Sequence, residues 1–417
     1  MISEFIYKLF SNRIHKDSSI VLAGTALNIT AGGAFFIFVP RFLGPVNYGL
    51  FSTVIATGLF ATSIANFGID TGILKFTSDK SKDSAKFLSL ALKLYIASGL
   101  ITSIIGIILS GFIANLLNQP QISFLLVIAF SSTIFLLLTN FYVAALQAKK
   151  EFVKAALVSL SSNVVRILIL LTLSLILTLS LNIITILFFF VTILSVITGK
   201  IFLPIKLENT QKKDLSAFFK FNVFIAASLI ISSIPFDNFI LLKLAGPLYT
   251  GLYAAPLKFL TFSYQFGGNF SKVIATDLFK VKNNQDLLKS VKNSTPVIIL
   301  FITGLIVIFI CSPIVNKLFF GQEFIGSEIV MRILLIGFAF FFLSIIPSSI
   351  ILYYFGKSQI LFYITLVKYT VYIFFLFLLI PNLKSFGAAW AFSISEIVAF
   401  ILMSVYILKK LYFNNVA

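Results

Sequence analysis

The chain has 417 residues, of which 59% are hydrophobic and only 11% are charged, and its mean hydropathy is +1.06. A soluble domain of this composition would expose large apolar patches, so a soluble enzyme and a soluble binding module are both excluded. The formal net charge of +18 indicates an anionic partner, either a membrane surface or a nucleic acid. The distribution of basic residues along the chain decides between them.

Residues 1–17 precede the first long apolar run. Ile2, Phe5, Ile6 and Leu9 recur at helical spacing, which predicts a short helix lying on the inner membrane surface. A frayed tail is the alternative. No small-residue cleavage site follows, so we expect the first span itself to act as the targeting signal.

Twelve apolar segments follow, each long enough to cross about 30 Å of hydrocarbon as a helix. They predict an all-α polytopic membrane protein with two pseudo-equivalent six-helix bundles, 1–205 and 221–417, joined by a polar cytoplasmic linker at 206–220. The connections are short and leave no room for a soluble catalytic domain, so we expect a protein that is not an enzyme. The segments are 20–39, 47–68, 90–111, 122–145, 156–178, 183–204, 221–241, 250–271, 295–315, 329–351, 360–380 and 387–408.

Basic residues gather in alternate connections. The two termini and the loops after the even-numbered spans hold most of the 32 Lys and Arg residues, whereas the opposite loops hold only Arg41, Lys243, Lys317 and Lys384. The positive-inside bias therefore places both termini in the cytoplasm. We expect the chain to lie in the inner, cytoplasmic membrane of the cell. The basic charge reflects topology, with anionic membrane lipids as its partner and no nucleic acid.

One motif occurs twice, 202 positions apart: RFLGPVNYGLFS (41–52) and KLAGPLYTGLYA (243–254). Each copy follows the first span of its half, on the predicted outer side. Because six spans separate them, the halves share one orientation and form a parallel repeat. Gly-Pro favours a turn that stops one helix and starts the next. Gly44-Pro45 and Gly246-Pro247 are thus plain turns or hinges, and both interpretations stay open.

Four ionisable residues lie deep within predicted spans, where a charge costs a few kcal/mol and usually marks a cavity or a substrate path. They are Arg166, Lys258, Lys368 and Glu396. Three cations and one anion predict a net positive cavity, which suits a diphosphate headgroup. The alternative is that Glu396 pairs with one cation while the others snorkel to the interface.

Other residues give weaker indications. Arg41 and Lys243, beside the two outer turns, are candidates to bind phosphate near the exit or to anchor the membrane interface. Asp237 and Arg332 lie nearer the outer surface, where snorkelling accounts for them. Pro256 lies two residues before Lys258, so it is either the kink of a moving, site-bearing helix or a static kink.

Cofactor chemistry has few candidate ligands. Cys311 is the only cysteine and His15 the only histidine, so we expect no metal site and no cofactor. His15 is expected to be a solvated juxtamembrane residue. Asn28 and Asn163 lie within spans, where they either bond sugar hydroxyls or, more commonly, bond neighbouring helices.

Four sequence stretches carry a resemblance to a known family. They are RFLGPVNYGLF after the first span, IANFGID closing the second, KLAGPLYTGLYAA in the second half and NKLFFGQEF after the ninth span. With twelve spans, the chain resembles the polysaccharide transporters of the O-antigen flippase type. These belong to the multidrug/oligosaccharidyl-lipid/polysaccharide (MOP) exporter superfamily, which also contains the MATE exporters. The first outer turn lacks the acidic residue usual in lipid II flippases.

The resemblance implies a flippase. Such a protein moves polyprenyl-(di)phosphate-linked oligosaccharide from the cytoplasmic to the outer leaflet for surface polysaccharide biosynthesis, by alternating access through a central cavity. Its partners would be the lipid-linked oligosaccharide, membrane lipids and the polymerase or glycosyltransferase machinery, and we expect a monomer. The alternative is a cation-coupled multidrug exporter of the same superfamily, although the excess of deep cations counts against cationic drugs. A membrane-embedded glycosyltransferase or polymerase would need a larger outer loop, and a scaffold without transport would not need deep charges.

Overall fold

The structure of the protein is a computed structural model that describes residues 13–77, 84–205, 208, 226, 230–278, 281 and 283–414. The juxtamembrane helix expected at 1–17 and the linker expected at 206–220 lie almost entirely outside these residues and stay predictions. Every regular element in the described ranges is helical, as expected where all backbone groups must be satisfied within the lipid.

The first half contains eight α-helices and one 3₁₀ turn among its described residues. In chain order they are α2 (Arg13–Asn66), α3 (Ile69–Thr77), α4 (Ser84–Leu116), η1 (Pro120–Ile122), α5 (Ser123–Ser131), α6 (Thr133–Ala148), α7 (Phe152–Ile176), α8 (Leu181–Phe190) and α9 (Thr192–Phe202).

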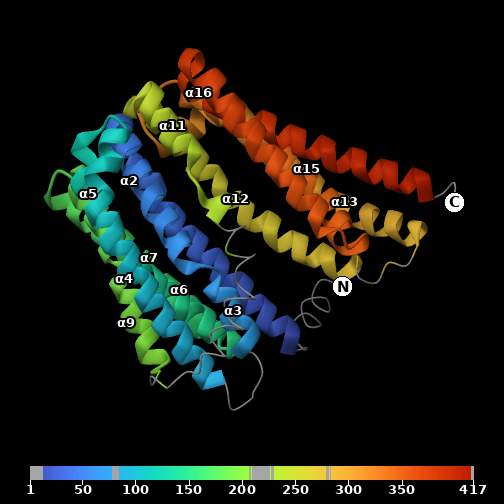
Figure 1. The fold of residues 1–417 in the computed structure, drawn as a ribbon. Coiled ribbons are helices and arrows are strands. Elements are labelled where there is room, and N and C mark those ends of the chain that lie inside the picture. Colours follow the sequence, from blue (N-terminus) through green and yellow to red (C-terminus); the bar gives the residue numbers. More distant parts are fainter. Residues whose placement is uncertain are drawn as a thin grey trace. The chain divides into compact units, whose positions relative to one another are not determined.

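The described part of the second half is also helical and ends in a single long run (Figure 1). It contains α11 (Phe236–Ala245), α12 (Pro247–Leu278), α13 (Asn284–Ile310), α14 (Ser312–Phe319), η2 (Gln322–Phe324), α15 (Ser327–Ser349), the π-helical turn η3 (Ile350–Tyr354) and α16 (Ser358–Asn414).

Two of these runs are too long to be single spans. At 1.5 Å per residue, the 54 residues of α2 and the 57 of α16 would extend about 80 Å, more than twice the hydrocarbon thickness. Each contains one residue with a non-helical backbone, Gly44 (φ 66°, ψ 170°) and Lys384 (φ 51°, ψ −123°). Each run therefore comprises two spans joined at that residue.

The described helices account for the predicted spans, apart from the start of the seventh, most of which lies outside the described residues. Eight stretches are long and apolar enough to cross a membrane. Dividing α2 and α16 at Gly44 and Lys384 adds two, and α11 and α12 occupy the predicted seventh and eighth positions. The chain is a multi-pass membrane protein with the all-α architecture expected from its sequence.

Packing divides the chain into two compact units. Unit 1 contains Met1–Phe35 and Phe51–Pro235, and unit 2 contains Phe36–Leu50 and Phe236–Ala417. Residues 36–50, which the sequence assigns to the first bundle, thus pack with the second unit. This short segment contains Gly44-Pro45 and all but the last two residues of the first copy of the repeated motif.

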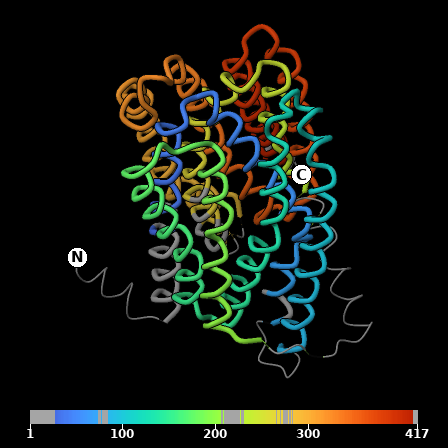
Figure 2. Tube along the Cα trace, turned by 90° about the vertical axis from the view of Figure 1, so that its left-hand side faces the viewer, coloured from blue at the N-terminus to red at the C-terminus, as the bar shows by residue number. Residues whose placement is uncertain are grey.

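Unit 1 is held together by close helix packing around glycine. In the bundle, α4 packs against α5 and α6, while α7 and α9 lie side by side (Figure 2). A Cβ added to Gly106 would lie 2.1 Å from the Phe130 ring, and one on Gly199 would lie 2.4 Å from the Tyr142 ring. Small residues that admit large neighbours are how helices approach each other in lipid, where no hydrophobic force drives them together.

Unit 2 is organised around α15, which packs against both α16 and α12 (Figure 1). Gly337 of α15 admits the ring of Phe392, which a Cβ would meet at 2.6 Å. The Ser393 hydroxyl donates to the Ile333 carbonyl at 2.6 Å and joins the same two helices. The second half of α16 is thereby fixed against α15.

The predicted orientation is testable because Cys311 is the only cysteine. In a Cys311→Ser background, we expect a membrane-impermeant maleimide to label Lys317→Cys in intact cells. Lys410→Cys and Lys149→Cys should be labelled only after permeabilisation. All three lysines are exposed, so a difference in labelling reports the side of the membrane. Labelling of Lys410→Cys in intact cells would contradict cytoplasmic termini.

Candidate functional site

The two copies of the repeated motif contact each other within unit 2. A Cβ added to Gly49 would lie 2.0 Å from the carbonyl oxygen of Pro247, and one added to Gly251 would lie 1.8 Å from the carbonyl oxygen of Pro45. The contact is reciprocal, because Gly49 corresponds to Gly251 and Pro45 to Pro247 in the repeat. Backbone meets backbone, at a separation that only glycine permits. We call this contact the Gly-Pro junction.

Turn chemistry places the residues of the Gly-Pro junction. Gly44 and Gly246 both have positive φ, 66° and 86°. The Gly246 amide donates to the carbonyls of Leu241 and Leu242, which closes the end of α11, and Pro247 begins α12. Glycine after a helix and proline at the start of the next is the favoured arrangement. These contacts explain the motif as a turn, whereas its action as a hinge stays a prediction.

A small pocket lies beside the first copy of the motif. It has a volume of about 340 Å³ and is lined in part by Arg41 and Glu323. The Arg41 guanidinium donates through Nη2 to the carbonyls of Lys317 and Leu318, which are among the last, otherwise unpaired carbonyls of α14. RFLGP therefore packs on NKLFFGQEF. Arg41 has a structural role here, and phosphate binding by Arg41 stays a prediction.

Lys243, the other cation predicted at an outer turn, lies in the last turn of α11 and is exposed. A cation at this position interacts favourably with the helix dipole. Among the described residues, Lys243 makes no contact with Arg41, so the structure does not bring the two together. Its binding of phosphate also stays a prediction.

The seventh span is interrupted near its middle. The helix breaks at Ile234–Pro235, and α11 begins at the next residue. Asp237 lies in this first turn, where one carboxylate oxygen accepts from the Asn238 amide at 2.8 Å. Its other oxygen accepts from the Tyr253 hydroxyl at 3.0 Å. The Tyr253 hydroxyl also lies 3.4 Å from the Tyr372 hydroxyl, so α11, α12 and α16 share one polar cluster.

This placement corrects the sequence-based expectation for Asp237. Snorkelling was expected to account for it, but the side chain is only partly exposed and is engaged by Tyr253. The expected position near the outer surface assumed that the seventh span is an uninterrupted helix, and the helix breaks at Pro235. The signal in the sequence was an acidic residue two positions after a proline within an apolar span.

Lys258 lies on α12, which continues through Pro256. Its ammonium lies 4.7 Å from the centroid of the Phe36 ring, a favourable cation–π distance. Tyr253 on the same helix bonds Asp237, so a carboxylate belongs to the same polar region of unit 2. Lys258 is thus half-buried in unit 2 and is stabilised by an aromatic face, with a carboxylate in its surroundings.

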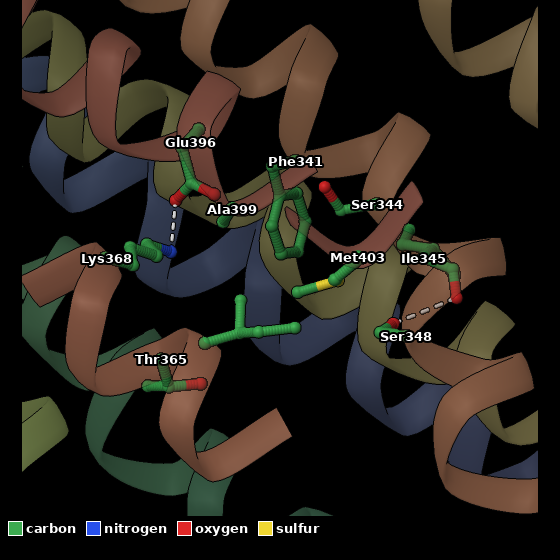
Figure 3. A pocket seen from close by; sticks show the side chains of 10 residues that line it. Phe341, Ser344, Ile345, Ser348, Thr365, Lys368, Glu396, Ala399 and Met403 are labelled. Carbon is green, nitrogen blue, oxygen red and sulfur yellow. Dashed lines mark hydrogen bonds and ion pairs between the residues drawn. The ribbon is translucent and has the colours of Figure 1, made fainter. Parts of the chain in front are cut away.

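Lys368 and Glu396 form an ion pair between the two halves of α16. The Lys368 ammonium lies 2.5 Å from Glu396 Oε1, and the two side chains are 26% and 3% exposed, respectively. Both line a cavity of about 190 Å³ between α15 and α16, shown in Figure 3. The alternative in which Glu396 pairs with one of the deep cations is therefore confirmed.

Arg166 lies in unit 1 and is 5% exposed. Its Nη1 donates to Asn163 Oδ1 at 2.7 Å, and its Nη2 donates to the carbonyl of Phe188 at 2.9 Å. That carbonyl is near the end of α8, where the helical ladder stops before α9. Asn163 in turn donates to Asn28 Oδ1 at 2.7 Å, so helix–helix bonding accounts for both amides. Arg166 and Asn163 together link α2, α7 and α8. Arg166 also binds a carbonyl at the break in the sixth span.

The deep charges are thus distributed between two units. Unit 2 contains Lys258 and Lys368 together with Asp237 and Glu396, so its cations are matched in number by carboxylates. The described partners of Arg166 in unit 1 are an amide, a carbonyl and the rings of Phe188 and Phe35, whose centroids are 4.5 and 5.6 Å away. Its Nε is buried without a hydrogen-bond partner among the described residues.

Comparison with known proteins identifies a family that fits this architecture. The polysaccharide biosynthesis protein family matches residues 14–267. The chain belongs to this family. The matched region begins in α2, contains both copies of the repeated motif and ends within α12.

Individual relatives agree with this assignment. A putative O-antigen transporter from Shigella flexneri is 28% identical over 195 residues, which are 46% of this chain and 46% of that protein. The match therefore spans less than half of that relative's length. An inward closed structure of the lipid II flippase MurJ has a TM-score of 0.76, with 17% identity, and covers 94% of this chain and 87% of that one.

A MATE family multidrug resistance transporter of the MOP superfamily, in an inward-facing conformation, has a TM-score of 0.74 with 13% identity. The alignment covers 94% of this chain and 96% of that one. At such identities the likeness establishes the fold, which is that of the MOP superfamily as expected from the motifs. It does not extend the substrates of those proteins to this chain.

The Gly-Pro junction should tolerate no side chain. We expect Gly251→Ala to destabilise the protein by about 1–3 kcal/mol, because its methyl group would overlap the Pro45 carbonyl. Gly304→Ala is the matched control, since a Cβ there meets nothing within 4 Å. Thermal unfolding in detergent measures the difference. Equal melting temperatures for the two variants would contradict the contact.

Removing either partner of the Lys368–Glu396 pair should destabilise the protein, and the loss of Lys368 should destabilise it more than the loss of Glu396. Lys368→Met leaves the nearly inaccessible Glu396 unpaired, and breaking a buried pair costs up to about 3–5 kcal/mol. Glu396→Leu leaves Lys368, which keeps access to the cavity, and should cost less. The double variant should recover stability relative to Lys368→Met. Thermal unfolding of the three proteins measures this, and an additive double variant would contradict the coupling.

Proposed function

We propose that this protein is a flippase that moves polyprenyl-(di)phosphate-linked oligosaccharide from the cytoplasmic to the outer leaflet during surface polysaccharide biosynthesis. The family assignment supports the pathway, and the partial match to a putative O-antigen transporter supports the transport step. The polyprenyl tail stays in the lipid while the headgroup and sugars cross through the protein.

The observation that carries the mechanism is the reciprocal Gly-Pro junction. Two equivalent turns from the two sequence repeats touch through bare backbone at Gly49 and Gly251. A contact between equivalent turns of the two sequence halves suits a gate that opens when those halves rock against each other. In this proposal, the junction closes the outer end of the substrate path and opens when the headgroup leaves.

The charge distribution narrows the candidates for headgroup binding. The proposed cavity residues are Arg166, Lys258, Lys368, Glu396, Arg41 and Lys243. Among them, Lys258 is the strongest candidate for a phosphate contact, because its described neighbour is an aromatic face and not a directly paired carboxylate. Lys368 is already paired with Glu396. Arg166 has structural partners, and its role in this scheme is to hold the sixth span in shape.

Transport in this direction needs no nucleotide. With the cell interior negative, each negative charge moved outward gains about 2.3 kcal/mol per 100 mV. We propose a monomer in the cytoplasmic membrane with both termini inside, acting beside the polymerase and glycosyltransferase machinery. A cation-coupled exporter of amphiphilic drugs is the competing function, and the test below separates the two.

In cells that lack this protein, lipid-linked oligosaccharide should accumulate on the cytoplasmic face, and the wild-type chain should restore surface glycan. We expect Lys258→Ala to lower export about tenfold or more, since a charge-assisted hydrogen bond contributes about 1.5–3 kcal/mol. Lys258→Arg should retain part of the activity. Lys357→Ala, in a predicted inner loop, is the control. Unchanged surface glycan with altered drug tolerance would support the competing exporter instead.

A second comparison separates transport from folding. We expect Arg166→Ala to reduce the amount of folded protein in the membrane, because it removes one hydrogen bond from the Phe188 carbonyl and one from the Asn163 side-chain oxygen. Transport per folded molecule should fall much less than in Lys258→Ala. Membrane abundance and export are measured together. Normal abundance with abolished export would assign Arg166 to substrate binding.

A further inference from the structure

The cavity beside the Lys368–Glu396 pair has an unusual combination of groups. One carboxylate oxygen of Glu396 bonds Lys368, and the other points away from the lysine, toward Ala399 and Phe341 (Figure 3). Three hydroxyl-bearing residues line the same cavity, Ser344, Ser348 and Thr365. Apolar residues complete the wall, among them Phe341, Ile345 and Met403.

The charges exclude two kinds of ligand. A phosphate entering this cavity would face the Glu396 carboxylate. Lys368, the only cation among the described residues that line the cavity, already pairs with that carboxylate at 2.5 Å. A metal cation that binds the Glu396 carboxylate would be repelled by the Lys368 ammonium, which lies 2.5 Å from the same carboxylate. Each charged ligand thus meets a like charge, which costs free energy in a site of low dielectric constant. A neutral ligand is repelled by neither charge.

The hydrogen-bonding groups favour a ligand rich in hydroxyls. Ser344 donates to the Phe340 carbonyl at 2.8 Å, and Ser348 donates to the Ile345 carbonyl at 3.0 Å. The hydrogens of both hydroxyls are thereby used, so both oxygens are acceptors toward the cavity. Glu396 adds a charged acceptor, and Lys368 adds the remaining ammonium donors. Thr365 has no hydrogen-bond partner among the described residues and can donate or accept.

The size restricts the ligand further. A volume of about 190 Å³ is below the roughly 300–1,000 Å³ of pockets that hold drug-sized ligands. It suits one ring and not an oligosaccharide. A ring with hydroxyls on its edge and C–H groups on its face would meet the acceptors on one side and the ring of Phe341 on the other.

We propose that this cavity is a binding subsite for one neutral sugar ring. The inference rests on the proposed function, since the sugar would belong to the glycan of the transported lipid. Glu396 and Lys368 bind adjacent hydroxyls, Ser344 and Thr365 select their positions, and Phe341 supports the ring. The ion pair thereby serves recognition of sugar and not of phosphate, which is left to other residues.

Binding is tested with the purified full-length chain in nanodiscs by saturation-transfer NMR. The probes are glucose, galactose, rhamnose and N-acetylglucosamine, with pyrophosphate as competitor. We expect at least one sugar to bind and pyrophosphate not to displace it. The double variant Ser344→Ala/Thr365→Val should bind it about fivefold to tenfold more weakly, as expected for one or two lost hydrogen bonds. Ala399→Leu, which fills the cavity, should abolish binding.

Ser395→Ala is the matched control. This serine precedes Glu396, but its hydroxyl donates to the Phe392 carbonyl at 2.7 Å and does not line the cavity, so its sugar affinity should be unchanged. Absence of binding by all four sugars, or displacement by pyrophosphate, overturns the proposal. Equal loss in Ser395→Ala and the double variant also overturns it.

Export of lipid-linked oligosaccharide is measured in parallel with the same variants. Normal export by Ala399→Leu overturns the sugar subsite and leaves the flippase function standing. Sugar binding by a wild-type chain that exports no lipid-linked oligosaccharide overturns the flippase function and leaves the binding site standing. The two failures are therefore distinguishable.

Discussion

The contact on which this architecture depends is the one between the Gly49 and Gly251 backbones and the carbonyls of Pro45 and Pro247. In lipid there is no hydrophobic force between helices, so their association relies on close van der Waals contact and on weak Cα–H hydrogen bonds. Glycine provides the closest approach. The price is that neither position accepts any other residue, which accounts for the identity of these positions in both copies of the repeat.

Much of the fold was predictable because it follows from local rules. Apolar runs of membrane length and alternating basic loops need only the sequence, and Gly44-Pro45 and Gly246-Pro247 indicated where helices end. The partners of the deep charges were less accessible to sequence analysis. Lys368 and Glu396 are 28 residues apart, and their contact depends on the rotation of two spans about their axes. Neither hydropathy nor helical periodicity specifies that rotation.

Two residues show how an interruption of helical structure changes the interpretation of a charge. Asp237 was expected near the interface because its span was taken as continuous, whereas the break at Pro235 places it among tyrosines. Arg166 was expected in a cavity because it lies deep within its predicted span. Its partner is the carbonyl of Phe188, which is available because the sixth span also breaks. Backbone groups released by helix breaks are invisible to a count of charged side chains.

The separation of residues 36–50 from the rest of their own helices has a consequence for how the protein is built. The chain duplicates a six-span sequence unit, yet the second packed unit includes fifteen residues borrowed from the first copy. A polypeptide that started after the linker would lack the partners of Gly251, Glu323 and the α14 carbonyls. A chain that holds only the second sequence repeat would therefore lack fifteen residues of the unit in which that repeat packs.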